Sequence, residues 1–393
     1  MPLDIKKIRA ETPGVKSVNH LLACGSALMP EPVLDAVVEH LKLEAQIGGY
    51  EAHAAHSEQL DFVYDQVAQL IGAKRQEIAL VENATVGWCQ VFYALPFKPG
   101  QRILTCQAEY AANYVAFLHR AKRDGVEIVV VPDDESGAVD VAALEELIDE
   151  RTALIAITWI PTNGGLVNPA AEIGKIANRA GVPYLLDACQ AVGQMPVDVS
   201  ELGCDFLSAT GRKFLRGPRG TGFLYVREAL IEGLEPAMID HFAAPWVSAN
   251  AYELRPDARR FETWENAYAL RAGLGVAAGY ANALGLENIQ ARSWGLAEWL
   301  RGQLIEIPGI TLHDSGSEHC AIVSFAFDGH DSAKIVSELC EQNICIGASS
   351  LDSTLLDSQA RKLPVLLRAA PHYYNSDDEL DELVAALGDF NSQ

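Results

Sequence analysis

The residues with the clearest chemical potential lie between positions 184 and 226. An apolar run there ends in Asp187, and Gln190 follows three residues later. A second apolar run leads to the motif TGRK at 210–213, which ends in Lys213 and is followed by a Gly-Pro-Arg-Gly turn at 217–220. A carboxylate, an amide, a hydroxyl, a guanidinium and an amine are therefore expected close together.

This combination of groups is suited to pyridoxal 5′-phosphate (PLP). A carboxylate keeps the pyridine nitrogen of PLP protonated so that the ring accepts electrons, and a lysine holds the cofactor as a Schiff base. Taken alone, Asp187 is more often a helix cap, and Lys213 is more often a solvated side chain. Because the two are separated by one helix and one strand and are joined by hydroxyl and cationic groups, together they favour PLP bound to Lys213.

The pattern of secondary structure around these residues predicts an α/β fold. Between residues 60 and 226, short β-rich runs alternate with helical stretches, which favours a mostly parallel sheet. The runs are apolar throughout, as in strands covered on both faces. Ligands of such sheets bind at the carboxyl ends of strands, which is where Asp187 lies. The expected strands are 78–81, 102–106, 127–131, 153–159, 184–187, 206–209 and 222–226, with helices at 141–149 and 170–180.

The second half of the chain has a looser pattern. An aromatic loop at 241–246 precedes a long Ala/Gly-rich helical stretch at 264–286, and a smaller α+β region follows with a strand at 321–327, a helix at 332–342 and a last apolar run at 366–369. We expect three parts: an N-terminal segment (1–20) that packs with the small domain, a large PLP-binding domain (21–263), and a linking helix with a small C-terminal domain (264–393).

Composition and charge narrow the function classes. The formal net charge is −23, from 30 basic and 53 acidic side chains. Such a balance repels nucleic acid and anionic membranes, so neither is an expected partner. The first residues lack the apolar core of a signal peptide and no run of about 18 apolar residues occurs, so a soluble cytoplasmic protein is expected. The eight cysteines are scattered without a CxxC pair, which predicts reduced, buried thiols and no metal site.

These motifs resemble the class V aminotransferase family of fold type I PLP enzymes, which includes cysteine desulfurases, epimerases and C–S lyases. The resemblance covers nearly the whole chain and rests on the block at 187–213, on ENATVGW at 82–88, on PTNGGLVNP at 161–169 and on LLRAAPHYYN at 366–375. It implies a large domain with a mostly parallel seven-stranded sheet and a small α+β C-terminal domain.

The resemblance also implies roles around the cofactor ring. Asp187 would pair with the pyridine nitrogen, and Gln190 and Asn163 would contact the ring oxygen O3′. Tyr110, in AEYAAN, occupies the position where the desulfurases stack a histidine on the ring. Lys213 is the catalytic residue that carries the cofactor.

Further residues are implied for the phosphate and the substrate. Thr85, at a helix N-terminus with free N–H groups, would bind the phosphate together with Thr210 and Arg212. Arg212 is a departure, since the desulfurases often have histidine before the lysine. Arg368 would clamp the substrate α-carboxylate through its planar fork. Thr263, in RRFETWEN, would reach the phosphate of a neighbouring subunit, which implies a homodimer with shared sites.

The reaction depends on the groups around the substrate Cα rather than on the fold. Cysteine desulfurases carry a nucleophilic cysteine on a loop shortly before the carboxylate-binding arginine, but residues 347–368 contain none, and Cys345 lies in an apolar run that we interpret as structural. This disfavours a persulfide mechanism and favours β-elimination, which releases pyruvate and ammonia.

The blocks at 210–226 and 259–266 resemble the C–S lyases of ergothioneine biosynthesis, which cleave hercynylcysteine sulfoxide. An epimerase, racemase or aminotransferase using the same Lys213 chemistry is the alternative. A PLP-binding regulator without turnover is a third hypothesis, against which the complete set of Asp187, Lys213 and Arg368 argues.

Overall fold

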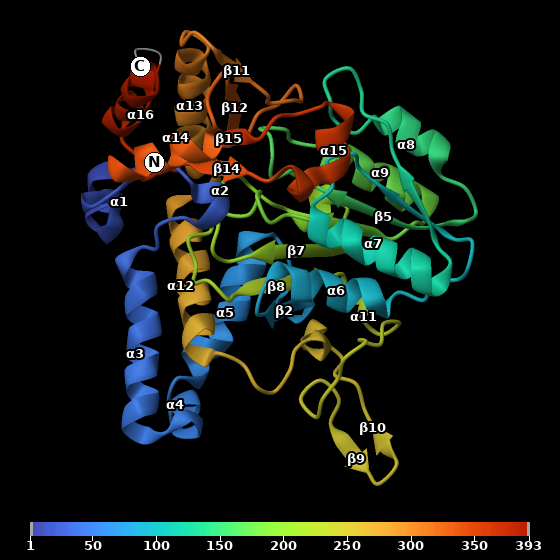
Figure 1. The fold of residues 1–393 in the computed structure, drawn as a ribbon. Helices are drawn as coiled ribbons and strands as arrows, with labels where there is room; N and C mark the ends of the chain where they lie inside the picture. Colours follow the sequence, from blue (N-terminus) through green and yellow to red (C-terminus); the bar gives the residue numbers. More distant parts are fainter. Residues whose placement is uncertain (1–2, 391–393) are drawn as a thin grey trace.

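A seven-stranded sheet forms the centre of the computed structural model, which describes residues 3–390 (Figure 1). Its strand order is β2-β8-β7-β6-β5-β3-β4, and only β8 runs antiparallel to its neighbours. This confirms the predicted α/β architecture with a mostly parallel sheet. The strands are β2 (Ile78–Val81), β3 (Arg102–Thr105), β4 (Glu127–Val130), β5 (Thr152–Thr158), β6 (Tyr184–Asp187), β7 (Phe206–Thr210) and β8 (Gly222–Val226).

Helices cover both faces of this sheet, which is why its strands are apolar throughout. Successive strand residues belong to different cores: Leu185 shares one with Trp88, whereas Leu186 shares the other with Ile173. The first core includes residues of α6 (Ala84–Ala94) and α7 (Ala111–Asp124), and the second includes residues of α9 (Ala170–Ala180). Two shorter helices, α8 (Val141–Leu147) and α10 (Val199–Leu202), contact α9.

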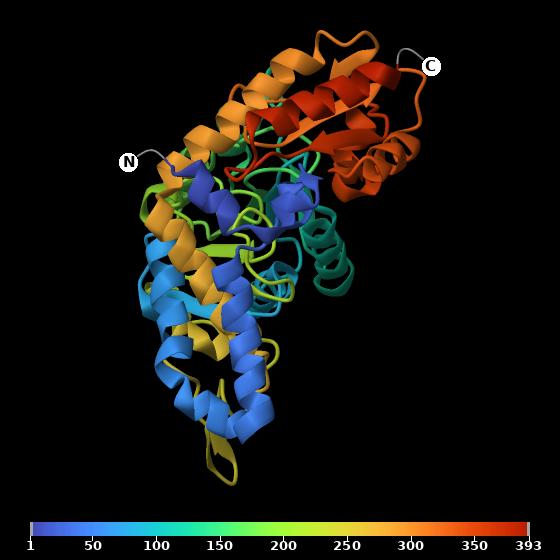
Figure 2. The same ribbon diagram turned by 90° about the vertical axis from the view of Figure 1, so that its left-hand side faces the viewer.

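Long helices flank the sheet on the side of β2. Helix α12 (Tyr268–Leu284) lies between α3 (Glu31–Ile47) and α5 (Ser57–Leu70), and Figures 1 and 2 show the three side by side. Glycines allow this approach, since a Cβ on Gly275 would lie 2.6 Å from a methyl of Val63. The predicted helix at 264–286 is therefore correct in kind but starts later, at Tyr268. Helix α4 (Gly49–Ala55) connects α3 to α5, and α13 (Leu286–Leu304) follows α12 in the chain.

A β-hairpin projects from the large sheet region and begins at Trp246, the last residue of the loop predicted at 241–246 (Figure 1). It consists of β9 (Trp246–Ser248) and β10 (Ala251–Tyr252), paired antiparallel, and all five of its strand residues are exposed. The short elements α11 (Glu228–Ile231) and η3 (Ala258–Phe261) flank it.

The C-terminal region is built on a second, antiparallel sheet in the order β11-β12-β15-β14. Its strands are β11 (Ile310–Leu312), β12 (Val323–Phe327), β14 (Gly347–Ser349) and β15 (Leu366–Ala369). Between and after them lie α14 (Ser332–Glu341), β13 (Ile344–Cys345), η4 (Leu351–Thr354), α15 (Leu355–Ala360) and α16 (Asp377–Asp389).

The N-terminal segment contacts this C-terminal region. Strand β1 (Asn19–His20) pairs parallel with β13, and Arg9 in α1 (Ile5–Ala10) donates to Glu379 of α16 at 2.9 Å. Elements η1 (Pro13–Lys16) and α2 (Ala23–Ser26) complete the segment. The division of the chain at residues 20 and 263 stays a prediction, and its outer ranges extend beyond the described residues.

All eight cysteines are free thiols. Cys24, Cys106, Cys204 and Cys320 are buried, but the prediction of buried thiols was wrong for Cys340, which is exposed. Its neighbour Leu339 occupies the buried face of α14, and one residue further along a helix turns the side chain by about 100° toward solvent. Within residues 3–390, no helix is long and apolar enough to cross a membrane.

Candidate active site

Lys213 lies in the connection between β7 and β8. Because β6 and β7 are parallel neighbours, Lys213, three residues after the end of β7, lies near the carboxyl end of β6 and interacts with the charge of Asp187. Removal from bulk water lowers the pKa of Lys213, and the nearby positive charge of Arg212 lowers it further, whereas Cys189 and Asp187 oppose this. The Lys213 amine is therefore easier to deprotonate than an exposed lysine.

Tyr110 and two arginines surround the same site. The Nζ atom of Lys213 lies 5.9 Å from the centroid of the Tyr110 ring. Burial, and then the charge of Asp187, raises the pKa of the Tyr110 hydroxyl, while the charges of Arg212 and Arg368 oppose the shift. The fold thus gathers five of the residues selected from the sequence.

Asp187 ends β6 and is held by two neutral donors. Asn113 Nδ2 donates to its Oδ2 at 2.9 Å, and the backbone N–H of Cys189 donates to its Oδ1 at 2.9 Å. Only 6% of Asp187 is exposed. A buried carboxylate whose partners are neutral is suited to receive a cation such as a protonated pyridine nitrogen.

Gln190 and Arg368 meet at Thr162, a residue that the sequence analysis missed. Gln190 Nε2 donates to Thr162 Oγ1 at 3.4 Å and to the carbonyl of Cys24 at 3.2 Å. Arg368 Nη1 donates to the same hydroxyl at 2.7 Å. Within the described part of the chain, the buried Gln190 Oε1 and Arg368 Nε have no hydrogen-bond partner. Gln190 Oε1 can therefore accept, and Arg368 Nε can donate, a further hydrogen bond to a ligand bound here.

Asn163 follows Thr162 but faces the small sheet. Its Nδ2 donates to Thr354 Oγ1 at 3.0 Å and to the carbonyl of Ser350 at 3.4 Å, and its Oδ1 accepts a bond from the Ser349 hydroxyl. The loop at 349–354 therefore lies against the site. The predicted contact of Asn163 with a ring oxygen stays a prediction and would require one of these bonds to be exchanged.

The residues predicted to bind phosphate lie at the same edge of the sheet. Helix α6 begins beside β7, where Ser208 Oγ donates to the carbonyl of Ala84 at 2.8 Å, so the exposed Thr85 in its first turn is close to the end of β7. Thr210 ends β7 and donates to the carbonyl of Thr221 at 3.4 Å. Arg212 is tied to the carbonyl of Gly25.

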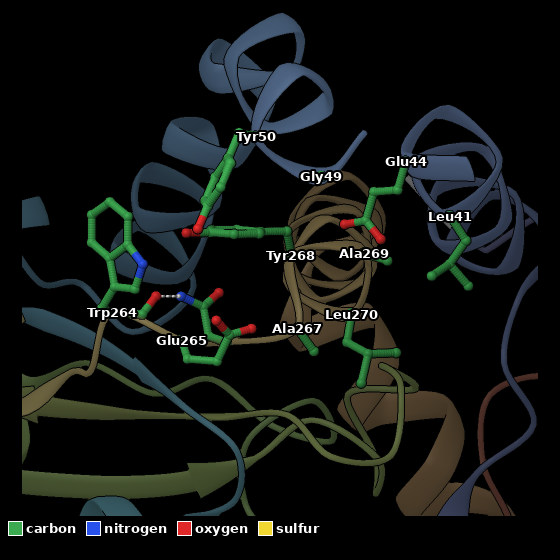
Figure 3. Close-up of a pocket in the computed structure, with 11 residues that line it drawn as sticks. Leu41, Glu44, Gly49, Tyr50, Trp264, Glu265, Ala267, Tyr268, Ala269 and Leu270 are labelled. Atoms are coloured by element: carbon green, nitrogen blue, oxygen red, sulfur yellow. Dashed lines mark hydrogen bonds between the residues drawn. The ribbon is translucent and has the colours of Figure 1, made fainter. Parts of the chain in front are cut away.

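Thr263 is not part of this cluster. It lies between η3 and α12, and its hydroxyl donates to the carbonyl of Glu265 at 3.2 Å. Beside it is a cavity of about 610 Å³. Figure 3 shows the rings of Tyr50, Trp264 and Tyr268 grouped at one end of this cavity. The contribution of Thr263 to a second subunit stays a prediction.

A buried histidine supports the Lys213 loop. His372 Nε2 lies 2.7 Å from the carbonyl of Phe214, and its Nδ1 lies 3.1 Å from the Ser293 hydroxyl. Burial, and then the charge of Arg216, lowers the pKa of His372 well below its ordinary value, so the ring is neutral. We assign the proton to Nε2, because the carbonyl can only accept. The sequence analysis gave His372 no role.

The two loops that carry Asp187 and Lys213 touch through a glycine. Gly193 has φ +93°, and a Cβ at this position would lie 2.3 Å from the backbone nitrogen of Leu215. Only glycine permits this approach. The contact fixes the carboxylate loop and the lysine loop relative to each other.

The chain belongs to the class V aminotransferase family, because the sequence model of this family matches residues 20–383. Members of this family are PLP enzymes, and the residues described above fit PLP, so PLP is the cofactor. The residues that fit PLP are Lys213 with its lowered pKa and Asp187 with its neutral partners. Beside them, Gln190 Oε1 and Arg368 Nε have no hydrogen-bond partner among the described residues.

Relatives and solved structures agree with this assignment. The chain is 31% identical to a probable cysteine desulfurase of Methanothermobacter thermautotrophicus, over 97% of this chain and 96% of the relative. It is 30% identical to a cysteine desulfurase of Pectobacterium atrosepticum, over 98% of each. The apo structure of the cysteine desulfurase from Thermococcus onnurineus NA1 superposes with a TM-score of 0.92 at 25% identity, covering 99% of this chain and 98% of the other.

Proposed function

We propose that this chain is a PLP-dependent carbon–sulfur lyase that acts on a cysteine-derived amino acid by β-elimination. The observation that carries the proposal is the loop at 349–354. It contacts Asn163 beside the site, and it presents the hydroxyls of Ser349 and Thr354 there rather than a thiol. A reaction that needs no sulfur acceptor on this loop fits these side chains best.

Each step has a residue suited to it. Arg368 binds the substrate α-carboxylate, and Asp187 holds the proton on the pyridine nitrogen. PLP, when bound, supplies the electron sink for the electrons released at Cα. Lys213, which would hold PLP, carries the amine that would take the Cα proton, a task that its lowered pKa favours. The C–S bond then breaks with its electron pair leaving on sulfur, and water converts the remainder to pyruvate and ammonia.

The proposal extends to a substrate. The relatives named cysteine desulfurases support a substrate built on cysteine. The likeness of residues 210–226 and 259–266 to ergothioneine-pathway lyases supports hercynylcysteine sulfoxide in particular. Its cleavage consumes one water and yields a sulfenic acid, pyruvate and ammonia.

Cysteine desulfuration is the second candidate. Two observations favour it: the relatives' names, and the thiol of Cys189, which is close enough to Lys213 and Asp187 to interact with both charges. Desulfuration transfers sulfur to a thiol and leaves alanine. Burial and the Asp187 charge, however, raise the pKa of Cys189 well above its ordinary value, which disfavours the reactive thiolate.

One assay separates the candidates. The purified protein is incubated with PLP and then with hercynylcysteine sulfoxide, simple S-substituted cysteines or cysteine, while pyruvate, ammonia and alanine are quantified. Pyruvate and ammonia in equal amounts, absent in Lys213→Ala, support the lyase. Alanine that disappears in Cys189→Ala supports desulfuration. Exchange of the Cα proton with deuterated water and no pyruvate would replace both by an epimerase or aminotransferase.

A cytoplasmic homodimer is part of the proposal. Exposed apolar side chains on α3, α4, α5 and the hairpin support a second subunit, among them Leu41, Ile47, Tyr50, Phe62 and Trp246. Free thiols support a reducing compartment. Light scattering of the purified protein tests the subunit number, and a monomeric mass would contradict the shared site.

A further inference from the structure

Glu109 is a buried carboxylate behind the site that none of the roles above uses. It lies between β3 and α7 and is 4% exposed. Its Oε2 accepts bonds from Thr105 Oγ1 at 3.0 Å and from the backbone N–H of Thr158 at 3.2 Å. Its Oε1 accepts a bond from the Thr158 hydroxyl. These donors hold the Glu109 carboxylate in place against β5, whose last residue, Thr158, pairs with Asp187.

Asn113 connects Glu109 to Asp187. Its Nδ2 donates to Glu109 Oε1 at 2.8 Å and to Asp187 Oδ2 at 2.9 Å, so each of its two amide hydrogens is used by one carboxylate. Asn113 is itself 4% exposed and lies in the first turn of α7, four residues after Glu109. The Glu109 carboxylate therefore helps to orient the Asp187 side chain through Asn113, together with the backbone N–H of Cys189.

Glu109 also fixes the second group expected against the cofactor ring. The backbone N–H of Tyr110 donates to Glu109 Oε1 at 3.0 Å. One carboxylate thus holds Tyr110 through its backbone and Asp187 through Asn113. A cofactor ring between Tyr110 and Asp187 would be positioned by Glu109 from two directions.

The two carboxylates, Glu109 and Asp187, favour the binding of a cation at this site. Every group that donates to Glu109 or Asp187 in these bonds is neutral, so two buried carboxylates share one amide without a cation between them. Burial is the main cause that raises the pKa of Glu109, and the charge of Asp187 adds to it, while the bonds from Thr158 and Asn113 oppose it. A cation bound at Asp187 relieves this repulsion, and a protonated pyridine nitrogen is such a cation.

We propose that Glu109 and Asn113 are positioning residues that set how strongly Asp187 holds the protonated ring nitrogen of PLP. The proposal rests on PLP as the cofactor and not on the lyase reaction. Its readout can therefore be cofactor binding, which separates its failure from a failure of the proposed function.

The test compares PLP with its 1-deaza analogue, in which a C–H replaces the ring nitrogen. Dissociation constants of both are measured by equilibrium dialysis for the wild type, Asn113→Ala and Glu109→Gln. We expect Asn113→Ala and Glu109→Gln to weaken PLP binding about ten- to a hundredfold, the range for losing one charge-assisted hydrogen bond. Binding of the analogue should change less than about threefold, because the analogue has no protonated ring nitrogen for Asp187 to bind.

A matched control distinguishes positioning from packing. Asn168 is also a buried asparagine, 2% exposed, that donates to the carbonyl of Thr158 and accepts from Val139, without touching Asp187. Asn168→Ala should lower the thermal midpoint of the apo-protein as much as Asn113→Ala does, yet weaken PLP and the analogue equally. The conservative Asn113→Ser covers the case in which Asn113→Ala does not fold. Equal losses of PLP and analogue in the Asn113 and Glu109 variants, or unchanged PLP binding, would overturn the proposal.

Discussion

Arg368 Nη1 donates to both the carbonyl oxygen and the hydroxyl of Thr162, each at 2.7 Å. These two bonds hold the guanidinium in one orientation, in which its buried Nε has no partner among the described residues. Thr162 therefore orients the guanidinium that we propose to bind the substrate carboxylate.

We expect Thr162→Val to raise the KM for the amino acid substrate about tenfold and to lower kcat less than threefold. The variant keeps the shape of the side chain and removes one of the two bonds that orient the guanidinium, each of which is worth a factor of about ten. Steady-state kinetics of the wild type, Thr162→Val and Arg368→Lys would test this. A fall in kcat at unchanged KM in Thr162→Val would contradict the assignment.

The stability of the apo-protein should depend on pH through Lys213. An unfolded lysine has its ordinary pKa of 10.5, and burial lowers the value in the folded protein. Between these two pKa values the unfolded chain binds more protons than the folded chain, so folding stability rises with pH across this window. Below the window, the full free-energy cost of burying a charged lysine lowers the stability. Lys213→Met should therefore be more stable than the wild type at pH 7, and this advantage should shrink toward pH 10.5.

Urea unfolding at pH 7 and pH 9.5 would measure the difference. The exposed Lys175 on α9 provides the matched control, since Lys175→Met also replaces a lysine by methionine but at a position that is not buried. An advantage of Lys213→Met that grew with pH would contradict the prediction.

Arg216 anchors the lysine loop and should be essential for its stability. It is 1% exposed, donates to Thr12 Oγ1 at 2.7 Å and to Tyr373 Oη at 2.9 Å, and lies 4.6 Å above the Tyr374 ring. Arg216→Ala should lower the free energy of unfolding by roughly 3 kcal/mol or more, because several buried bonds are lost together. Denaturant titration would show this, and the exposed Arg219→Ala from the same loop should stay within about 0.5 kcal/mol of the wild type.

Asp133 provides a second pH-dependent contribution. Burial is the main cause that raises its pKa from 3.8 to about 7, and the charge of Asp357 on α15 adds to it. Between these values the folded protein binds more protons, so stability falls as pH rises from about 4 to 7. Asp133→Asn should gain stability relative to the wild type at pH 8 but not at pH 4.

The neighbouring Asp134 should behave in the opposite way. Bonds from Ser136 hold its pKa below the ordinary value, so its carboxylate stabilises the fold at neutral pH and Asp134→Asn should destabilise it there. Thermal unfolding of both variants at pH 4 and pH 8 is the measurement. Shifts of the same sign at pH 8 would contradict the assignment of charge to these two groups.

The central sheet could be predicted because its strands are short apolar runs bounded by turn residues. The predicted ranges 78–81, 184–187 and 222–226 match β2, β6 and β8 at both ends. The hairpin β9–β10 could not be predicted, since its exposed residues show no alternation of apolar and polar side chains. The end of the long helical stretch was correct to within two residues, because Gly285 separates α12 from α13.

The candidate site was predictable where one motif holds several groups and not where contacts come from distant segments. Asp187, Gln190 and Lys213 lie in one block, so their proximity could be inferred from the order of elements. Thr162 and Asn113 gain their roles only through residues far along the chain. A signal for Asn113 was present, since it follows Glu109 by four residues on a helix that starts after a strand end.

The pairing of β1 with β13 joins residues near the start of the chain to residues near its end. During synthesis, residues 78–226 of the large sheet can associate as soon as they leave the ribosome, because every strand pairs within that range. The segment around Asn19 has to wait until residue 344 is available. The segment around Asn19 therefore completes its pairing long after the strands of the large sheet have been made.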